Sequence, residues 1–100
     1  MNDESLDCMI RLKNLTAPRI TPEHLKSIIK SVDYHVFPGT QLTVCCMTLI
    51  NGFTVTGESA CASPENFDKE IGEHAAYGNA FNKLWSLEGY LLKQRLFDHG

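Results

Sequence analysis

The sequence lacks several features that would place the protein in a specialised class. No apolar run approaches the ~20 residues that a membrane-spanning helix needs, and the opening residues are too polar and acidic for a signal peptide. Lys and Arg together number 9 and the net charge is −3, so the basic stripe typical of nucleic-acid-binding proteins is missing. We therefore expect neither a membrane nor a nucleic acid as a partner, and we expect the protein to act in the cytoplasm.

The sequence also lacks the residue spacings of common catalytic and metal sites. Its four cysteines (Cys8, Cys45, Cys46 and Cys61) show no C-x-x-C spacing, and thiols stay reduced in the cytoplasm. Cys45 and Cys46 are neighbours in a predicted strand, so they face opposite sides of a sheet and cannot share one metal ion. A zinc site from Cys46, Cys61 and a histidine is the weaker alternative. We predict a protein that is not an enzyme and that holds no cofactor.

What is present is a strong β-hairpin pattern from Leu42 to Cys61. Asn51-Gly52 separates two alternating apolar runs, and this dipeptide predicts a two-residue type I′ turn. Such a turn pairs Cys46 with Gly57. It also buries one face of the hairpin, made of Leu42, Val44, Cys46, Ile50, Phe53 and Val55. Gly57 leaves a gap in that face, which either admits a closely packed helix or marks a bulge.

A short helix is predicted before the hairpin. Thr21 suits its N-cap and Pro22 its first position. Leu25, Ile28, Ile29 and Val32 recur at helical spacing and form its predicted apolar face.

A long helix is predicted after the hairpin, from a cap at Ser63 and Pro64 to about Leu96. The weak alternation over residues 8–15 leaves room for a third strand. The predicted fold is therefore α+β, an antiparallel β-hairpin, with a third strand allowed, packed with one short and one long C-terminal helix. We assign residues 1–19 to an N-terminal tail and extended segment, and residues 20–97 to a single domain.

The long helix carries two apolar rows. The first row is predicted to face the hairpin and contains Phe67, Ile71, Ala75, Gly78, Phe81, Trp85, Gly89, Leu92 and Leu96. The second row lies roughly 130° further round the helix and contains Tyr77, Ala80, Leu84, Leu87 and Leu91. Small residues at Gly72, Ala76 and Ala80 would permit close approach of another element.

A helix that is apolar on most sides is expected to be buried on most sides. Unbroken, this one would run ~50 Å at the usual rise, so it either bends near a glycine or projects and is covered by another chain. We infer self-association, most simply as a two-fold dimer, through Ala80, Leu84, Leu87 and Leu91. The alternative is a monomer in which the first helix and the N-terminal segment cover the second row.

The residues that carry the clearest family resemblance lie in the hairpin and the long helix. They are Asn51-Gly52-Phe53, Gly57 to Cys61, Pro64 to Phe67, Gly72, Ala76, Ala80, Lys83-Leu84-Trp85 and Leu87 to Leu92. Over residues 20–96 this pattern resembles the phage family named after gene product 49 of one phage and gene product 66 of another. The resemblance implies a small protein of tailed phages or prophages, made in the host bacterial cytoplasm. It implies no reaction and no catalytic residues.

Two functions are consistent with these observations. The first is a phage accessory protein that binds a host protein, in host takeover or counter-defence. The second is an oligomeric protein that sequesters a small nucleotide-like ligand at a subunit boundary. For either one, the candidate partner or ligand surface consists of Tyr77, Asn79, Lys83, Tyr90 and Arg95.

Overall fold

The computed structural model describes residues 17–100 of the chain. In order, its elements are α2 (Pro22–Ser27), β1 (Ile29–Val36), β2 (Leu42–Leu49), β3 (Thr54–Ala60), a 3-10 turn η1 (Pro64–Asn66) and α3 (Lys69–His99). The three strands form one antiparallel sheet in the order β1-β2-β3. This arrangement confirms the predicted α+β fold with a third strand. The residues 8–15 that were considered for that strand lie outside the described part of the chain.

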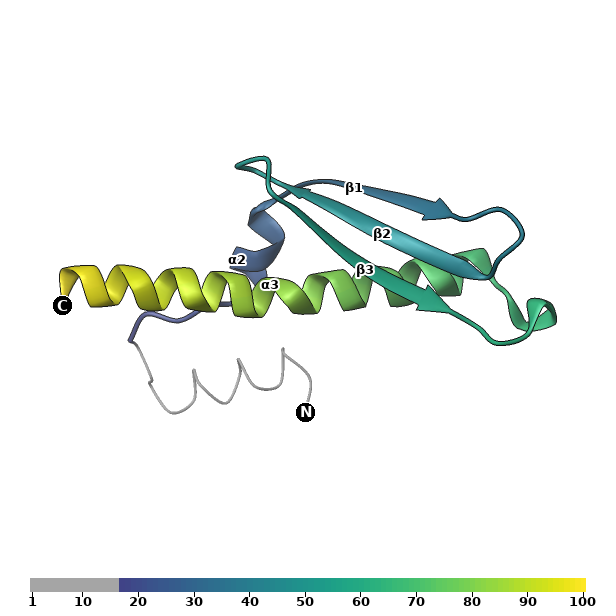
Figure 1. Ribbon diagram of the computed structural model, residues 1–100. Helices are drawn as coiled ribbons and strands as arrows, with labels where there is room; N and C mark the ends of the chain where they lie inside the picture. The colour runs from purple at the N-terminus through teal and green to yellow at the C-terminus, as the bar shows by residue number, and fades with distance from the viewer. Residues whose placement is uncertain (1–16) are drawn as a thin grey trace.

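Helix α3 packs along one face of the sheet, and its C-terminal end extends past the strands (Figure 1). The short helix α2 lies beside it. The core between them contains Leu25 and Ile28, the β-strand residues Cys45, Met47, Leu49 and Val55, and the helix residues Ala76, Ala80 and Leu84. The opposite face of the sheet, which carries Asp33, Cys46 and Thr56 in one cross-strand row, is not covered by either helix.

The first helix is shorter than the periodicity predicted. Thr21 caps it as expected, since its side-chain hydroxyl accepts a hydrogen bond from the backbone N–H of His24. The helix ends at Ser27, however, and Ile29 to Val36 form β1. β-Branched and aromatic residues in this stretch favour a strand, and the free edge of β2 supplies the backbone hydrogen bonds that a strand needs.

The hairpin forms where it was predicted, but its register differs by one residue. Leu49 and Phe53 are hydrogen-bonded to each other across the loop, so the loop has three residues, with Gly52 at φ +91°. This is the three-residue loop with glycine in a left-handed conformation, rather than the two-residue turn. Cys45, not Cys46, therefore lies opposite Gly57.

This shift turns every β2 side chain to the other face of the sheet. The buried residues of β2 are Thr43, Cys45, Met47 and Leu49, whereas the predicted Leu42, Val44 and Cys46 face outward and are half-buried. Val55 is buried as predicted, and Ile50 and Phe53 at the loop are exposed.

Gly57 marks the closest approach of α3 to the sheet. A Cβ atom at this position would overlap backbone atoms of Ala76 and Ala80. Of the two roles considered for Gly57, the structure shows the first, a gap that admits a closely packed helix.

Helix α3 is continuous over 31 residues, and it begins later than predicted. Asp68 caps it by accepting a hydrogen bond from the backbone N–H of Ile71, while Ser63 caps only the preceding 3-10 turn and makes no side-chain hydrogen bond there. The helix does not break at its glycines. At 1.5 Å per residue it spans ~46 Å, which is most of the 52 Å longest dimension of the molecule.

The row of α3 that faces the sheet is not the one that was predicted. Ala76, Ala80 and Leu84 are fully buried beneath the strands, whereas Ile71 and Leu96 of the first row are exposed. Phe81 and Trp85 pack only against the margin of the core. The small side chains of Ala76 and Ala80 allow the close contact at Gly57, which bulkier residues would prevent.

Candidate functional site

An open groove of about 390 Å³ lies between β3 and the middle of α3. The hairpin places β3 next to the helix, and Phe53 stands at the end of this groove with 56% of its surface exposed. The lining residues are Phe53, Thr54, Val55 and Thr56 from the hairpin and Lys83, Ser86 and Leu87 from α3.

Three of the five predicted surface residues lie along this edge of α3. Asn79, Lys83 and Tyr90 fall within about 40° of one another at 100° per residue, on the side that faces β3. The Asn79 side-chain amide donates a hydrogen bond of 2.8 Å to the backbone carbonyl of Glu58 in β3. Lys83 makes no ion pair with any residue that the structure describes. Tyr90 is 74% exposed.

Tyr77 and Arg95 do not belong to this surface. Both lie roughly 120–160° from Asn79, Lys83 and Tyr90 around the helix. Tyr77 is half-buried against the core and stacks on Phe81, with ring centroids 6.0 Å apart. The predicted five-residue surface is thus divided between two sides of α3.

The four residues predicted for self-association are also divided. Ala80 and Leu84 are fully buried under the sheet of their own subunit, so another chain cannot reach them. Leu87 and Leu91 continue the same side of α3 toward its C-terminus and are 39% and 38% exposed. Helix α2 contacts this part of α3, where the His24 ring nitrogen Nε2 lies 2.8 Å from a Glu88 carboxylate oxygen.

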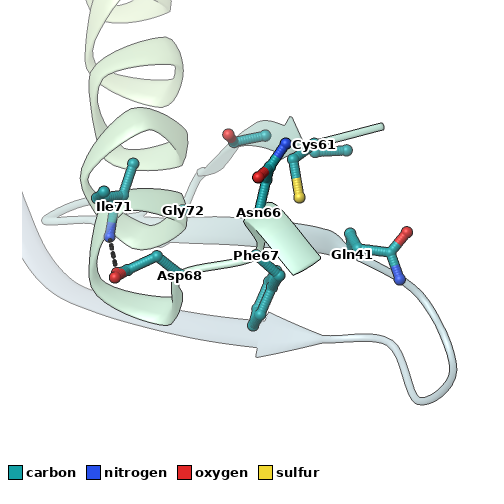
Figure 2. Close-up of a pocket in the computed structure, with 9 residues that line it drawn as sticks. Gln41, Cys61, Asn66, Phe67, Asp68, Ile71 and Gly72 are labelled. Carbon is teal, nitrogen blue, oxygen red and sulfur yellow. Dashed lines mark hydrogen bonds between the residues drawn. The ribbon is translucent and has the colours of Figure 1, made fainter. Parts of the chain in front are cut away.

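A second hollow, of about 240 Å³, lies at the N-terminal end of α3 (Figure 2). Gln41, Cys61, Asn66 and Asp68 contribute polar atoms to its wall. The Asp68 carboxylate is occupied in capping the helix, and the Cys61 thiol donates to the carbonyl of Ser63. None of the residues of the described chain that line this hollow is cationic. This hollow was not predicted, because the sequence pattern places the helix cap at Ser63 and not at Asp68.

The thiols differ in their surroundings. Cys45 is fully buried, and this burial, with a smaller contribution from the neighbouring Cys46, raises the pKa of its thiol. A buried thiol with a raised pKa stays protonated at neutral pH and is a poor nucleophile. Within residues 17–100, no group of three His, Cys, Asp or Glu side chains is arranged to hold a metal ion.

The fold and the groove together define a class of protein, a small α+β scaffold with a long helix and a largely apolar groove whose lining includes one lysine. The chain belongs to the Phage protein (N4 Gp49/phage Sf6 gene 66) family, whose model matches residues 20–96. This match confirms the resemblance predicted from the hairpin and the Trp85 to Leu92 pattern. Neither the curated proteins nor the solved structures contain a match to the chain.

The family identifies the chain as a phage protein. Among the helices of the described region, none combines the length and hydropathy needed to cross a lipid bilayer.

Proposed function

We propose that this phage protein is a non-enzymatic accessory protein that binds a host protein in the bacterial cytoplasm, in host takeover or counter-defence. The observation that supports the proposal is the groove between β3 and α3, which is lined by the exposed Phe53 together with Lys83, with the exposed Tyr90 on the same edge of α3 as Lys83. Aromatic side chains at the centre of an interface supply much of its binding energy. Exposing them to water without a partner is unfavourable.

The composition of the groove indicates the kind of partner. Phe53 and Leu87 offer apolar contact area, and the hydroxyl groups of Thr54, Thr56 and Ser86 offer hydrogen bonds. Lys83 provides the only charge in the lining. A host segment with an apolar side chain next to a carboxylate would complement this arrangement, because the carboxylate would pair with the lysine as the apolar side chain enters the groove.

Affinity capture from a lysate of the host bacterium tests the proposal. The tagged wild type is compared with Phe53→Asp and Tyr90→Asp, and Phe37→Asp serves as the control. Phe37 is also exposed but follows β1, at the other end of the sheet from the β2–β3 loop. We expect one host protein to be retained by the wild type and the control, and its affinity to fall more than ten-fold in both groove variants, since hot-spot residues contribute ~2 kcal/mol or more. Equal retention by all four proteins would show that the groove is not the binding surface.

The same groove supports a second candidate function, sequestration of a small anionic, nucleotide-like ligand, within one subunit rather than at the subunit boundary that was predicted for it. Lys83 could pair with a phosphate and the Phe53 ring could stack on a base, with hydroxyl groups from Thr54, Thr56 and Ser86 nearby. Arg95, which was considered for such a pocket, lies on another side of α3.

Thermal denaturation with a panel of nucleotides separates the two functions. A ligand at one hundred times its Kd stabilises the native state by ~2.7 kcal/mol, which would raise the Tm clearly. We expect Lys83→Ala to remove such a shift. A panel that leaves the Tm unchanged would exclude the nucleotides tested and favour the host-protein proposal.

A further inference from the structure

Helix α3 carries a second regular pattern on the side away from the sheet. Eight residues alternate at spacings of four and three, and we call them the outer seam: Ile71, Ala75, Gly78, Asn82, Trp85, Gly89, Leu92 and Leu96. These positions have heptad spacing over more than three heptads, the spacing of helices that pack side by side in pairs, with large apolar side chains at Ile71, Trp85, Leu92 and Leu96. Most of it coincides with the first apolar row, which the sheet does not cover.

Residues 17–100 leave the outer seam accessible. Ile71 and Leu96 at its two ends are 69% and 45% exposed. A Cβ atom at Gly78 or Gly89 would meet no heavy atom within 4 Å in the described structure. Trp85 is half-buried, with part of its ring against the margin of the core. The seam is therefore an apolar face with room for a helix backbone to approach at two glycines.

The pattern is complementary to itself when it is reversed. If two copies of α3 run antiparallel and cross between Lys83 and Leu84, Gly78 of each copy lies opposite the partner's Gly89. Ile71 then lies opposite the partner's Leu96, and Ala75 opposite the partner's Leu92. Asn82 lies opposite the partner's Trp85, and one polar residue in a heptad seam is a known means of fixing register. Each aliphatic side chain of the seam thus meets another apolar side chain, and the two glycines meet each other.

The charges beside the seam fit the same arrangement. Glu70 lies near its N-terminal end, and Lys93 and Arg95 lie near its C-terminal end, all exposed. Reversal brings Glu70 of one copy opposite the partner's Phe97 and within one turn of the partner's Arg95. Antiparallel packing also places the positive end of one helix dipole next to the negative end of the other. A parallel pair would instead bring together groups of like charge.

We propose that the outer seam of α3 binds a second copy of this chain, antiparallel and about a two-fold axis. The seam lies roughly 100° around the helix from the edge that carries Lys83 and Tyr90. The dimer would therefore leave the groove of each subunit open. This inference does not depend on the proposed function, and it replaces Ala80 and Leu84 with a surface that another chain can reach.

Disulfide cross-linking tests the orientation. Gly78→Cys and Gly89→Cys are purified separately, mixed and oxidised, with the wild type as the control for the native cysteines. We expect a disulfide-linked dimer from the mixture and none from either variant alone, because two copies of residue 78 would lie ~16 Å apart along the helices. A dimer from one variant alone, or none from the mixture, would overturn the antiparallel arrangement.

Light scattering of the full chain tests the surface. We expect a dimer for the wild type and a monomer with unchanged helix content for Gly89→Leu. In the described subunit the Cβ of this substitution meets no heavy atom within 4 Å, and leucine improves helix propensity, so loss of folding would not explain loss of the dimer while the helix content is unchanged. Tyr90→Asp on the groove side should stay dimeric. A monomeric wild type at the highest attainable concentration, a dimeric Gly89→Leu or a monomeric Tyr90→Asp would each overturn the proposal.

Discussion

Replacement of Gly57 by alanine tests how closely α3 approaches the sheet. The added Cβ would lie 2.8 Å from Cα of Ala80 and still closer to the backbone nitrogen of Ala80 and the carbonyl oxygen of Ala76. These atoms belong to the hydrogen-bonded backbone of a continuous helix, so they cannot rotate away as the end of a long side chain could. The whole helix would have to move away from the strands.

The expected loss of stability in Gly57→Ala is the balance of two opposing effects. Inserting a methyl group into a well-packed core costs ~1–3 kcal/mol, while removing the excess backbone freedom of a strand glycine recovers ~0.5–1 kcal/mol. Movement of the helix would also weaken the packing of Ala76, Ala80 and Leu84. We therefore expect Gly57→Ala to lower the free energy of unfolding by ~2 kcal/mol, which for a domain of this size lowers the Tm by ~8–16 °C.

Urea unfolding followed by circular dichroism, at one fixed protein concentration, measures this loss. Gly78→Ala is the matched control when all proteins are compared at a concentration low enough to be monomeric, because it makes the same chemical change on the open side of α3, where helix propensity predicts a gain of ~0.5–1 kcal/mol. If Gly57→Ala unfolds at the same urea concentration as the wild type, the close approach of α3 to β3 is wrong.

Three further substitutions probe the core and its edge. Thr43 is fully buried, and its hydroxyl group has no hydrogen-bond partner in the described structure, so Thr43→Val should raise the free energy of unfolding by ~1 kcal/mol in urea titrations; a loss would reveal a partner for that hydroxyl. The raised pKa of Cys45 means that the folded state favours the neutral thiol. Its contribution to stability is complete below the pKa of the unfolded thiol, ~8.5, and is lost as the pH rises from there toward the folded pKa. Cys45→Ala should therefore flatten the fall in Tm above that pH, apart from the contribution of Tyr34, whose pKa burial also raises. Glu88→Gln should change the unfolding free energy by less than ~1 kcal/mol, since its partner His24 is largely exposed, and a larger loss in urea would show that the contact between α2 and α3 depends on this pair.

The hairpin shows how far local sequence determines structure. Asn51-Gly52 located the loop correctly, because few residues other than these adopt positive φ at low cost. The same dipeptide fits both a two-residue turn and a three-residue loop, and these differ in register by one. The choice depends on which face of β2 meets α3. Thr43, Cys45, Met47 and Leu49 form a face as apolar as the one predicted, so the pattern of β2 alone could not decide.

The boundary between α2 and β1 was missed for a similar reason. Ile28, Ile29 and Val32 recur at a spacing that fits one face of a helix. Their β-branched side chains fit a strand as well. The unpaired edge of β2 decides between helix and strand for this segment, and local periodicity does not contain this tertiary feature.

The candidate surface was predicted in part, and the reason lies in the geometry of α3. Periodicity identified two apolar rows but not which one the sheet covers. The better guide was the set of small residues Gly72, Ala76 and Ala80, because only a narrow helix face can approach Gly57. Once that face is fixed, the positions of the other residues follow from 100° per residue. Asn79, Lys83 and Tyr90 fall beside β3, and Tyr77 and Arg95 fall on the far side.

The same geometry accounts for the apolar character of α3. One side is filled by the sheet, and the adjacent edge borders the groove around Lys83. The remaining side is the heptad seam, whose two glycines have no packing role in the described subunit. Glycine in the interior of a helix costs ~1 kcal/mol relative to alanine, so a monomeric protein would gain stability from alanine at both positions. A second backbone that approaches Gly78 and Gly89 closely gives both residues a role. Alanine at these positions would then weaken the dimer, although it would stabilise the monomer.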